Sequence, residues 1–500
     1  MQNANTKTSF HSRFSKFIKN NYALILLILT GLTIRIFFAQ ADPFLHNWDE
    51  RFHALVARNM MDEPFIPMLK TTTLLSYDDL NAWCCNHIWL HKQPLFMWQM
   101  ALSMKIFGVS ELSMRLPSVL MGTIMILFLF RITLLLTGNK TTALIAATLL
   151  CFSHFHLILI AGIKNIDHND VAFGFYILAS FWAYIEYTKS RRWGWVVLIG
   201  LFAGCAILNK WLTGLAVFFA WGICLLSGPK EKNRKELIRF IVALTVCGIV
   251  FIPWQIYIFK AFPKEAGYEA AYNLKHLFEA VEGHKGSIFF YLRKLPMYFG
   301  SYLWMGIFPG IILAFLNKNI NKKILLSLIL TILFIFSFFS FVAKTKMDTY
   351  CFMIAPICMI FIAISLHSLY IMSSRKYIFI TLYLSAIVLS LNLREINDYF
   401  SVNNQKRNRK IYNTLLYKNL KTYIPDHVKI VMGINSLEDV EVMFYNKDIT
   451  ANHWWITKED LERLAAQQIP IATFKNRGSY IIPDYILNYP YLYIINEELK

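Results

Sequence analysis

The amino-acid sequence predicts an all-α polytopic membrane protein with helices in the membrane interface and a small α/β domain outside the membrane. Hydrophobic residues make up 56% of the 500 residues and charged residues only 16%, and the mean hydropathy is +0.43. Soluble domains do not have this composition. Apolar runs of about 20 residues, long enough to cross a bilayer, follow one another along the chain. After about residue 400 the sequence becomes more polar, which predicts a domain in water.

Apolar runs predict about 11–13 membrane-spanning helices. The runs cover residues 22–39, 116–136, 143–161, 171–188, 194–209, 211–227, 238–259, 301–316, 324–343, 350–372 and 376–393. The first run contains no small-residue cleavage site between Leu24 and Phe38, so we expect it to remain as a helix.

Basic residues in alternate loops indicate which side of the membrane each loop occupies. If the N-terminus lies inside, the inner segments contain many basic residues but only two acidic ones, Glu231 and Glu236. The basic residues are Lys7, Arg13, Lys16, Lys19, Lys140, Lys189, Arg191, Arg192, Lys230, Lys232, Arg234, Lys235, Lys318, Lys322, Lys323, Arg375 and Lys376. The excess of 50 Lys and Arg over 31 Asp and Glu is therefore a topology signal, and no nucleic-acid partner is expected.

This topology divides the chain into three parts. Residues 1–21 are a cytoplasmic N-terminus, residues 22–395 are the membrane domain with outer loops over 41–115 and 260–300, and residues 396–500 are an extracytoplasmic domain. In the last part we predict strands over His427–Ile434, Val440–Tyr445 and Tyr480–Ile482, a helix over Lys458–Gln468, and a linker near Asn403–Lys410.

Acidic residues on the outer side are the first candidates for chemistry. Apolar residues recur at helical spacing from Asp49 to Met61, which predicts an interfacial helix with Asp49 and Glu50 at its N-terminus. A simple helix cap is the alternative for this pair, since the helix dipole favours carboxylates there. The second outer loop holds Asn165, Asp167, His168, Asn169 and Asp170 before the next span.

Two separated carboxylate sites are what a reaction needing a base and a charge stabiliser would use. A divalent metal bound by Asp167, His168 and Asp170 is the alternative, because these are suitable hard and borderline ligands. The sequence contains no Walker motif and no glycine-rich dinucleotide loop, so nucleotide cofactors have no support.

Cations gather on the same side as these carboxylates. They are Lys92, Lys210, Lys285, Arg293, Lys294, Lys344 and Lys346, and several histidines, including His91 and His284, accompany them. Lysines at span ends commonly reach toward lipid headgroups, but Lys210 lies in a short turn between two spans. Together these cations suit a phosphate ester whose lipid tail lies in the bilayer.

Several short motifs resemble those of the bacterial membrane glycosyltransferases of the protein mannosyltransferase and aminoarabinose lipid A transferase type, which have the GT-C fold. The resemblance covers roughly residues 22–360. The matching motifs are Trp48-Asp49-Glu50 with the helix that follows, Lys92-Gln93-Pro94-Leu95, Phe107-Gly108 with Arg115-Leu116-Pro117-Ser118, Asp170, Gly204–Leu208 with Asn209-Lys210, and Thr345-Lys346 with Tyr350 and Pro356. The chain departs from the family pattern at His91, Gln93 and Trp211, where an acidic residue, proline and glycine are usual.

The resemblance implies transfer of a sugar from a polyprenyl-phosphate donor of the undecaprenyl type to a lipid A-like glycolipid or a protein, on the outer face of the bacterial inner membrane. It implies that Asp49, Asp170 and Glu50 are catalytic, with Asp49 as the base or orienting carboxylate. The implied phosphate ligands are Lys92, Lys346, Tyr350, Lys210 and Arg58, and the implied substrate contacts are His91, His284 and Asp167.

No cofactor is required by this chemistry, because the activated donor supplies the energy; a divalent metal stays the alternative stated above. The membrane lipids are further expected partners. A polytopic flippase or transporter of lipid-linked sugars is the alternative function. It predicts polar residues along the middle of several spans, and only His154 and His156 fit that description.

Overall fold

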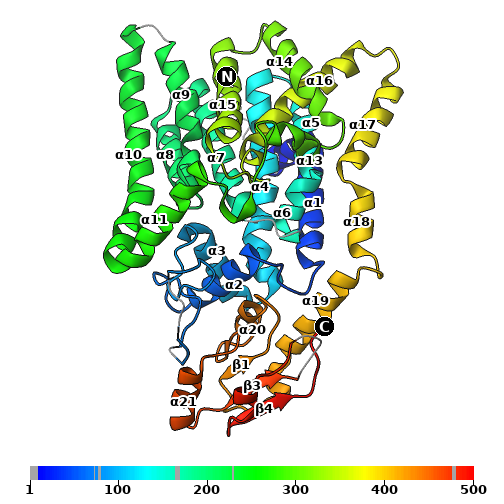
Figure 1. The fold of residues 1–500 in the computed structure, drawn as a ribbon. Helices are drawn as coiled ribbons and strands as arrows, with labels where there is room; N and C mark the ends of the chain where they lie inside the picture. Colours follow the sequence, from blue (N-terminus) through cyan, green and yellow to red (C-terminus); the bar gives the residue numbers. More distant parts are fainter. Residues whose placement is uncertain (1–9, 73, 77–79, 164–168, 228–229, 476–479) are drawn as a thin grey trace.

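The computed structural model describes residues 10–72, 74–76, 80–163, 169–227, 230–475 and 480–500. A bundle of helices forms one part of the molecule, and a small parallel sheet forms the opposite end (Figure 1). The helices of the bundle are α1 Phe10–Gln40, α4 Glu111–Thr137, α5 Lys140–Cys151, α6 His154–Ile160, α7 Asn169–Ser190, α8 Trp193–Ile207, α9 Ala216–Leu226, α10 Lys230–Ala261, α14 Ile307–Leu316, α15 Lys322–Ser337, α16 Ala355–Met372 and α17 Lys376–Ser390.

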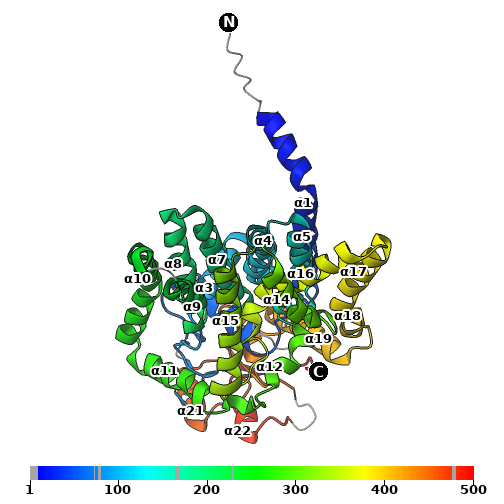
Figure 2. The same cartoon turned by 90° about the horizontal axis from the view of Figure 1, so that it is seen from above.

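Each of the eleven predicted runs coincides with a helical segment, and the predicted class of polytopic helical membrane protein is confirmed. Within the described ranges, six helices are long and apolar enough to span a membrane, or up to eight when two bent pairs are included. One bent pair joins α5 to α6 at an angle of 49°. The predicted number is larger because it also includes α8 and α9, which are shorter apolar helices, and the more polar α7. Figure 2 shows α10 and α17 on opposite sides of the bundle.

Capping residues mark where several of these helices begin and end. Ser110 caps α4 by accepting a hydrogen bond from the Ser113 backbone, and the Ser113 side chain accepts one from the Ser110 backbone in return. This reciprocal arrangement satisfies two N–H groups that the helix leaves without partners. The same helix ends at Gly138, whose φ of 67° is a left-handed conformation that glycine adopts without strain. Asn139 and Asn321 cap α5 and α15.

Glycines allow pairs of helices to approach closely. A Cβ atom at Gly310 on α14 would overlap the carbonyl oxygen of Phe361 on α16, and one at Gly204 on α8 would lie 2.7 Å from the Cys247 carbonyl oxygen on α10. Association of helices within a membrane depends on such close packing, because lipid is as apolar as the helices themselves.

Gly310→Ala is therefore expected to destabilise the bundle by about 1–3 kcal/mol, the usual cost of overpacking. Thermal unfolding of the purified protein in one detergent measures the effect. Gly222→Ala is the matched control, since a Cβ at Gly222 on α9 meets nothing within 4 Å. Equal stability of the two variants would contradict the close approach of α14 to α16.

Shorter helices complete the fold. They are α2 Asp49–Asn59, α3 Pro94–Phe107, α11 Pro263–Phe278, η3 Val281–Gly283, α12 Phe290–Arg293, α13 Leu295–Phe299 and α18 Leu393–Phe400. Of these, α2 and α3 lie between the bundle and the sheet (Figure 1). The predicted helix that starts at Asp49 is confirmed, and Pro94 occupies the first turn of α3, where a missing N–H costs nothing.

The C-terminal sheet has four parallel strands in the order β2-β1-β3-β4. The strands are β1 Ile430–Met432, β2 Thr450–Ala451, β3 Ile471–Phe474 and β4 Leu492–Ile495, and the accompanying helices are α19 Gln405–Lys418, α20 Asp439–Tyr445, α21 Lys458–Ala466 and α22 Asp484–Leu487. The β1 prediction within His427–Ile434 and the α21 prediction are confirmed.

Three predictions in this region are wrong. Val440–Tyr445 belongs to α20, in which the residues from Asp439 to Phe444 are all buried, so its alternation of apolar and acidic residues does not mark an exposed face. Tyr480–Ile482 contains no strand beyond a single bridge residue. Asn403–Lys410 is not a linker, because Asn404 caps α19 and the helix begins at Gln405.

Buried polar contacts hold α2 and the loop after it against the C-terminal region. Arg51, two residues after Asp49, lies 3.0 Å from Glu441 and 3.7 Å from Glu438 of α20 and is 2% exposed. In Figure 1, α20 lies next to α2. Lys70 of the first outer loop donates to Asn452 at 2.6 Å. The C-terminal region thus holds the segment that carries Asp49.

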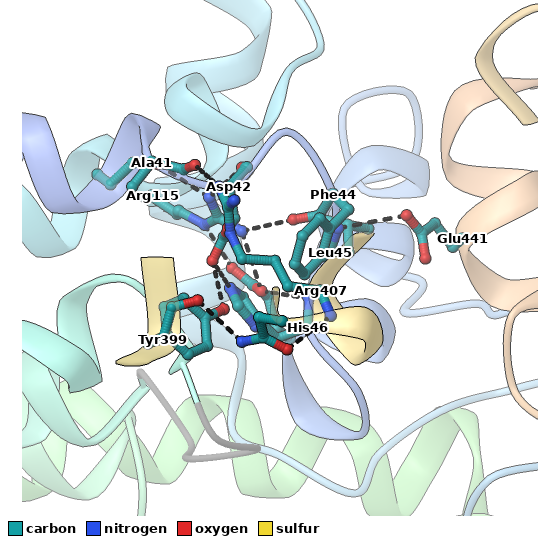
Figure 3. Close-up of polar contacts among 12 residues, drawn as sticks. Ala41, Asp42, Phe44, Leu45, His46, Arg115, Tyr399, Arg407 and Glu441 are labelled. Carbon is teal, nitrogen blue, oxygen red and sulfur yellow. Dashed lines mark hydrogen bonds and ion pairs between the residues drawn. The ribbon is translucent and has the colours of Figure 1, made fainter. Parts of the chain in front are cut away.

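A second buried cluster fastens the same segment to the bundle (Figure 3). Arg115 of α4 lies 2.6 Å from Glu50 and also donates to the carbonyl oxygens of Ala39, Asp42 and Phe44. The Asp42 carboxylate accepts hydrogen bonds from Tyr399 OH at 2.5 Å and Arg407 Nε at 2.7 Å. These contacts join residues 39–50 to α4, α18 and α19.

Candidate functional site

A cavity of about 730 Å3 is lined by residues of α7, α9, α11 and α15 and of the loop that precedes α3. Most of its wall is apolar. The lining residues include Phe173, Leu212, Leu215, Phe218, Phe219, Leu277, Phe334, Ile335, Phe338, Phe339 and Met353, with polar residues His91, Lys92, Gln93, Asp170, Lys210, Tyr272, Asn273, His276, Glu282 and Tyr350. An apolar pocket with a few convergent polar groups is the usual form of a ligand site.

Asp170 and Lys210 form one ion pair in the cavity wall. Asp170 lies in the first turn of α7, and Lys210 lies in the turn after α8. Neighbouring amides fix the two segments together: Asn169 Nδ2 donates to the Asn209 carbonyl oxygen, and Asn209 Nδ2 donates to Asn169 Oδ1 at 2.6 Å. The Lys210 ammonium also lies 5.7 Å from the centre of the Tyr350 ring.

Asp49 and Lys92 form a second ion pair, with 3.4 Å between Asp49 Oδ1 and Lys92 Nζ. Lys92 lines the cavity, whereas Asp49 lies behind it at the N-terminus of α2. The preceding residue, Trp48, has a φ of 64°, which is unusual outside glycine. Strained backbone of this kind is retained where the surrounding structure holds it in place.

His91, next to Lys92, pairs with a carboxylate that the sequence did not reveal. Its Nδ1 lies 3.1 Å from Glu269 Oε2 on α11, and its ring stacks on Trp83 with the ring centres 4.6 Å apart. Glu269 is 4% exposed. Burial raises the pKa of Glu269 to about 7, although the positive charge of Lys92 opposes the shift.

Glu282 adds a fourth carboxylate at the cavity, after Asp170, Asp49 and Glu269. It has a φ of 53° and accepts hydrogen bonds from Trp83 Nε1 at 2.5 Å and Tyr272 OH at 2.7 Å. Although burial alone would raise the pKa of Glu282, these two hydrogen bonds bring it below its ordinary value. Burial and Lys92 lower the pKa of His276 to about 4, so that ring is neutral at pH 7.

Comparison with known proteins agrees with this architecture. Residues 91–257 match the model of the family described as dolichyl-phosphate-mannose-protein mannosyltransferase. The undecaprenyl phosphate-alpha-4-amino-4-deoxy-L-arabinose arabinosyl transferase of Yersinia pestis is 26% identical over 259 residues, which are 51% of this chain and 45% of that protein. The protein of the same name from Yersinia enterocolitica is also 26% identical over 259 residues. The matched part thus spans less than half of the length of these relatives.

Solved structures match nearly the whole chain. ArnT from Cupriavidus metallidurans, bound to undecaprenyl phosphate, superposes with a TM-score of 0.63 at 15% identity and covers 93% of this chain and 90% of its own. The chain has the ArnT fold. The archaeal oligosaccharyltransferase AglB from Archaeoglobus fulgidus, in complex with an inhibitory peptide and a dolichol-phosphate, has a TM-score of 0.57 at 13% identity and covers 87% of this chain and 64% of its own. The resemblance identified from the motifs is confirmed.

The ArnT-like fold brings only some of the predicted site residues together. Asp170, Lys210, Lys92, His91 and Tyr350 all line the cavity, and Asp49 pairs with one of them. The sequence signals that located them are local ones, namely helix starts, turns between apolar runs and polar residues in the outer loops.

Other predicted site residues lie elsewhere. Lys346 is 6% exposed and its ammonium donates to the carbonyl oxygens of Phe339, Ser340 and Ala343, so it caps the short helix Phe338–Val342 that follows α15 and is not among the described residues that line the cavity. Glu50 is held by Arg115. Arg58 donates to the Met443 carbonyl oxygen at 2.7 Å, which places it against the C-terminal region.

The remaining two predicted substrate contacts are not part of the described cavity wall. His284 is largely exposed and follows Glu282, and Asp167 lies outside the described residues together with His168. Within the described ranges, no group of three or more His, Cys, Asp or Glu side chains is placed to hold a metal ion. The metal alternative rested on two residues beyond those ranges and stays a prediction.

Glu269, Glu282, Tyr272 and His276 are the site residues that sequence reasoning missed. All lie in the outer loop over 260–300, which the topology identified without any motif. The amphipathic helix α11 carries three of them, and only the fold shows that this helix covers the same cavity as Lys92.

Proposed function

We propose that the protein is a glycosyltransferase that moves a sugar from a polyprenyl-phosphate donor to an acceptor on the outer face of the bacterial inner membrane. The observation that carries this proposal is a largely apolar cavity with two lysines in its wall, Lys92 and Lys210, each of which forms an ion pair with a carboxylate, Asp49 and Asp170 respectively. A lipid tail fits the apolar wall, and a phosphate fits the lysines. The relatives named as undecaprenyl-phosphate arabinosyl transferases, and an ArnT structure bound to undecaprenyl phosphate, support the donor class.

The arrangement of charge suits cleavage of a glycosyl phosphate. As the bond between the anomeric carbon and the phosphate breaks, positive charge grows on the sugar and negative charge grows on the leaving phosphate. Lys92 and Lys210 stabilise the phosphate, while the Asp170 carboxylate faces the sugar. Fixed charges in a site shielded from water act strongly, because little rearrangement is needed during the reaction. Asp49 keeps the Lys92 ammonium in place.

The proposal includes an orientation in the membrane. The N-terminus is cytoplasmic, and the cavity and the C-terminal region face the periplasm, in agreement with the alternation of basic loops in the sequence. The acceptor is a glycolipid such as lipid A, or a protein, and membrane lipids surround the bundle.

The orientation can be tested by labelling. A cysteine introduced at exposed Lys447 should react with a membrane-impermeant thiol reagent added on the periplasmic side.

The experiment that tests the function uses protein purified into lipid vesicles and a panel of radiolabelled sugars linked to polyprenyl phosphate. The wild type should transfer label to an acceptor lipid or protein fraction from at least one of these donors and from no nucleotide sugar. If it transfers none but moves labelled lipid across the vesicle membrane, the transferase proposal fails and the flippase alternative replaces it.

A further inference from the structure

Two cysteines stand side by side in the first outer loop. The Sγ atoms of Cys84 and Cys85 lie 3.0 Å apart, and both residues are partly exposed. The other cysteines lie in or beside helices of the bundle and are Cys151, Cys205, Cys224, Cys247, Cys351 and Cys358. Of the eight cysteines in the sequence, this pair alone lies outside the bundle.

A tight turn holds the two sulfur atoms together. The Cys85 N–H donates to the Ala82 carbonyl oxygen at 3.1 Å, and the Leu80 N–H donates to Asn86 Oδ1 at 2.7 Å. Asn86 is fully buried, and Cys84 packs against the main apolar core. The segments on both sides of the pair are thus fixed, and its partial exposure leaves it within reach of a redox partner in water.

We propose that Cys84 and Cys85 are a redox site that forms a reversible disulfide, and that this bond fixes Trp83 beside the cavity. The inference rests on the proposed function, because the orientation proposed there places the loop in the periplasm, where disulfides form. Binding of a metal ion is another use of adjacent thiols. Within the described ranges, however, no group of three or more His, Cys, Asp or Glu side chains is placed to complete such a site.

The oxidant is a protein disulfide of the kind that keeps the periplasm oxidising. The thiolate of one cysteine attacks a sulfur atom of this oxidant, and the other sulfur atom of the oxidant leaves as a thiolate. The thiolate of the second cysteine then attacks the first, so that the bond between Cys84 and Cys85 forms and the mixed disulfide breaks. The pair loses two protons and two electrons, and the oxidant becomes a dithiol.

Reversibility follows from the adjacency of the two residues. Consecutive Cα atoms are about 3.8 Å apart, whereas the Cα atoms of most disulfides are at least about 4.4 Å apart. A bond between neighbours is therefore strained and easily reduced. It also closes no long loop, so it adds little to the stability of the fold. Its effect is local.

Trp83 carries that local effect to the site. It directly precedes Cys84, its Nε1 donates to Glu282 at 2.5 Å, and its ring stacks on His91 with the ring centres 4.6 Å apart. Both Glu282 and His91 line the cavity. The disulfide restricts the backbone next to Trp83, whereas reduction lets the turn move. Donor binding must then order this side chain, which costs affinity.

Mass spectrometry of the tryptic peptide 71–92 tests the bond directly, because this peptide contains both cysteines and no others. Membranes are denatured in the presence of an alkylating reagent. The peptide should stay unalkylated, weigh two hydrogen atoms less than the dithiol, and take two alkyl groups after treatment with glutathione. Peptide 193–210, whose one cysteine is Cys205 on α8, is the control and should be alkylated without reductant. Two alkyl groups on peptide 71–92 before reduction, or a disulfide to another chain, would overturn the proposal.

Sugar transfer tests the link to Trp83. Reduction should raise KM for the donor by about 2–10-fold, the cost of ordering one side chain, and change kcat little. The double variant Cys84→Ser with Cys85→Ser should have the raised KM in both redox conditions and the unfolding temperature of the wild type. Cys224→Ser, on α9, is the control and should respond to reductant as the wild type does. A donor KM that reduction leaves unchanged would refute the role of the bond.

Failure of the proposed function gives a different result. If the wild type transfers no sugar, hydrogen exchange of peptide 71–92 still tests the turn: faster exchange after reduction supports its fixing by the disulfide, and equal exchange refutes it. Labelling of Lys447→Cys tests the orientation separately. A dithiol in protein that is labelled from the periplasm overturns the redox site, whereas a dithiol in protein that is not labelled there overturns the orientation on which the site rests.

Discussion

Asp170→Asn should lower kcat/KM for sugar transfer by about 10²–10³-fold, the usual effect of removing one fixed charge or donor aimed at a transition state. Asp170 lines the cavity with 7% of its surface exposed, and Lys210 is its ion-pair partner. Asn has nearly the same shape but carries no charge. The variant therefore loses the electrostatic stabilisation of the sugar, while the first turn of α7 keeps the hydrogen bond from Asn169 to the Asn209 carbonyl oxygen.

Steady-state transfer from the donor identified with the wild type measures this loss. Asp62→Asn is the control, because the Asp62 carboxylate lies at the surface, where it pairs with exposed Lys447. The double variant Asp170→Asn with Lys210→Met separates the loss of the carboxylate from the disturbance of its lysine partner. If Asp170 acts only by holding Lys210, the double variant should be no slower than Asp170→Asn alone. A rate within threefold of the wild type for Asp170→Asn would remove Asp170 from the proposed site.

Much of the site could be predicted from the sequence because the relevant signals are local. Asp49 and Asp170 stand at helix starts, Lys210 stands in the turn between two apolar runs, and Lys92 stands in the first outer loop just before Pro94. Hydropathy shows where such runs end, and the distribution of Lys and Arg shows that the ends share one side. The sequence therefore places these carboxylates and lysines on one side of the membrane, without showing which of them form ion pairs.

Other residues could not be placed from the sequence, because long-range contacts decide where their side chains lie. Nothing near Lys346 in the sequence indicates that its ammonium caps the short helix Phe338–Val342, and nothing near Glu50 indicates that it pairs with Arg115, 65 residues later. Glu269 was missed for the same reason, since its partner His91 lies 178 residues away. Val440–Tyr445 resembles a strand because Glu441 alternates with apolar residues, yet that glutamate is buried against Arg51.

Arg115→Met should destabilise the protein by about 3–5 kcal/mol, since removing one partner of a buried pair leaves the other charge uncompensated. A guanidinium has five N–H donors. In this structure Arg115 makes two hydrogen bonds to Glu50 and one each to the carbonyl oxygens of Ala39, Asp42 and Phe44, and it is fully buried. Met fills a similar volume but satisfies none of these acceptors.

Thermal unfolding in one detergent, followed at matched protein concentration, measures the change. Arg394→Met is the control, because Arg394 is 94% exposed and lies 4.0 Å from its partner Asp398. The double variant Arg115→Met with Glu50→Leu should be more stable than Arg115→Met alone, since it removes the stranded carboxylate. Equal stability of the two would mean that the carbonyl oxygens, and not Glu50, account for the loss.

The same variant links stability to activity. Glu50 is the neighbour of Asp49 in the first turn of α2, and Asp49 holds Lys92 at 3.4 Å. If Arg115 fixes that turn, the folded fraction of Arg115→Met should also show a higher KM for the donor, because Lys92 is held less firmly. A donor KM equal to that of the wild type would instead confine Arg115 to stability and leave the placement of Asp49 to Arg51 and its partners on α20.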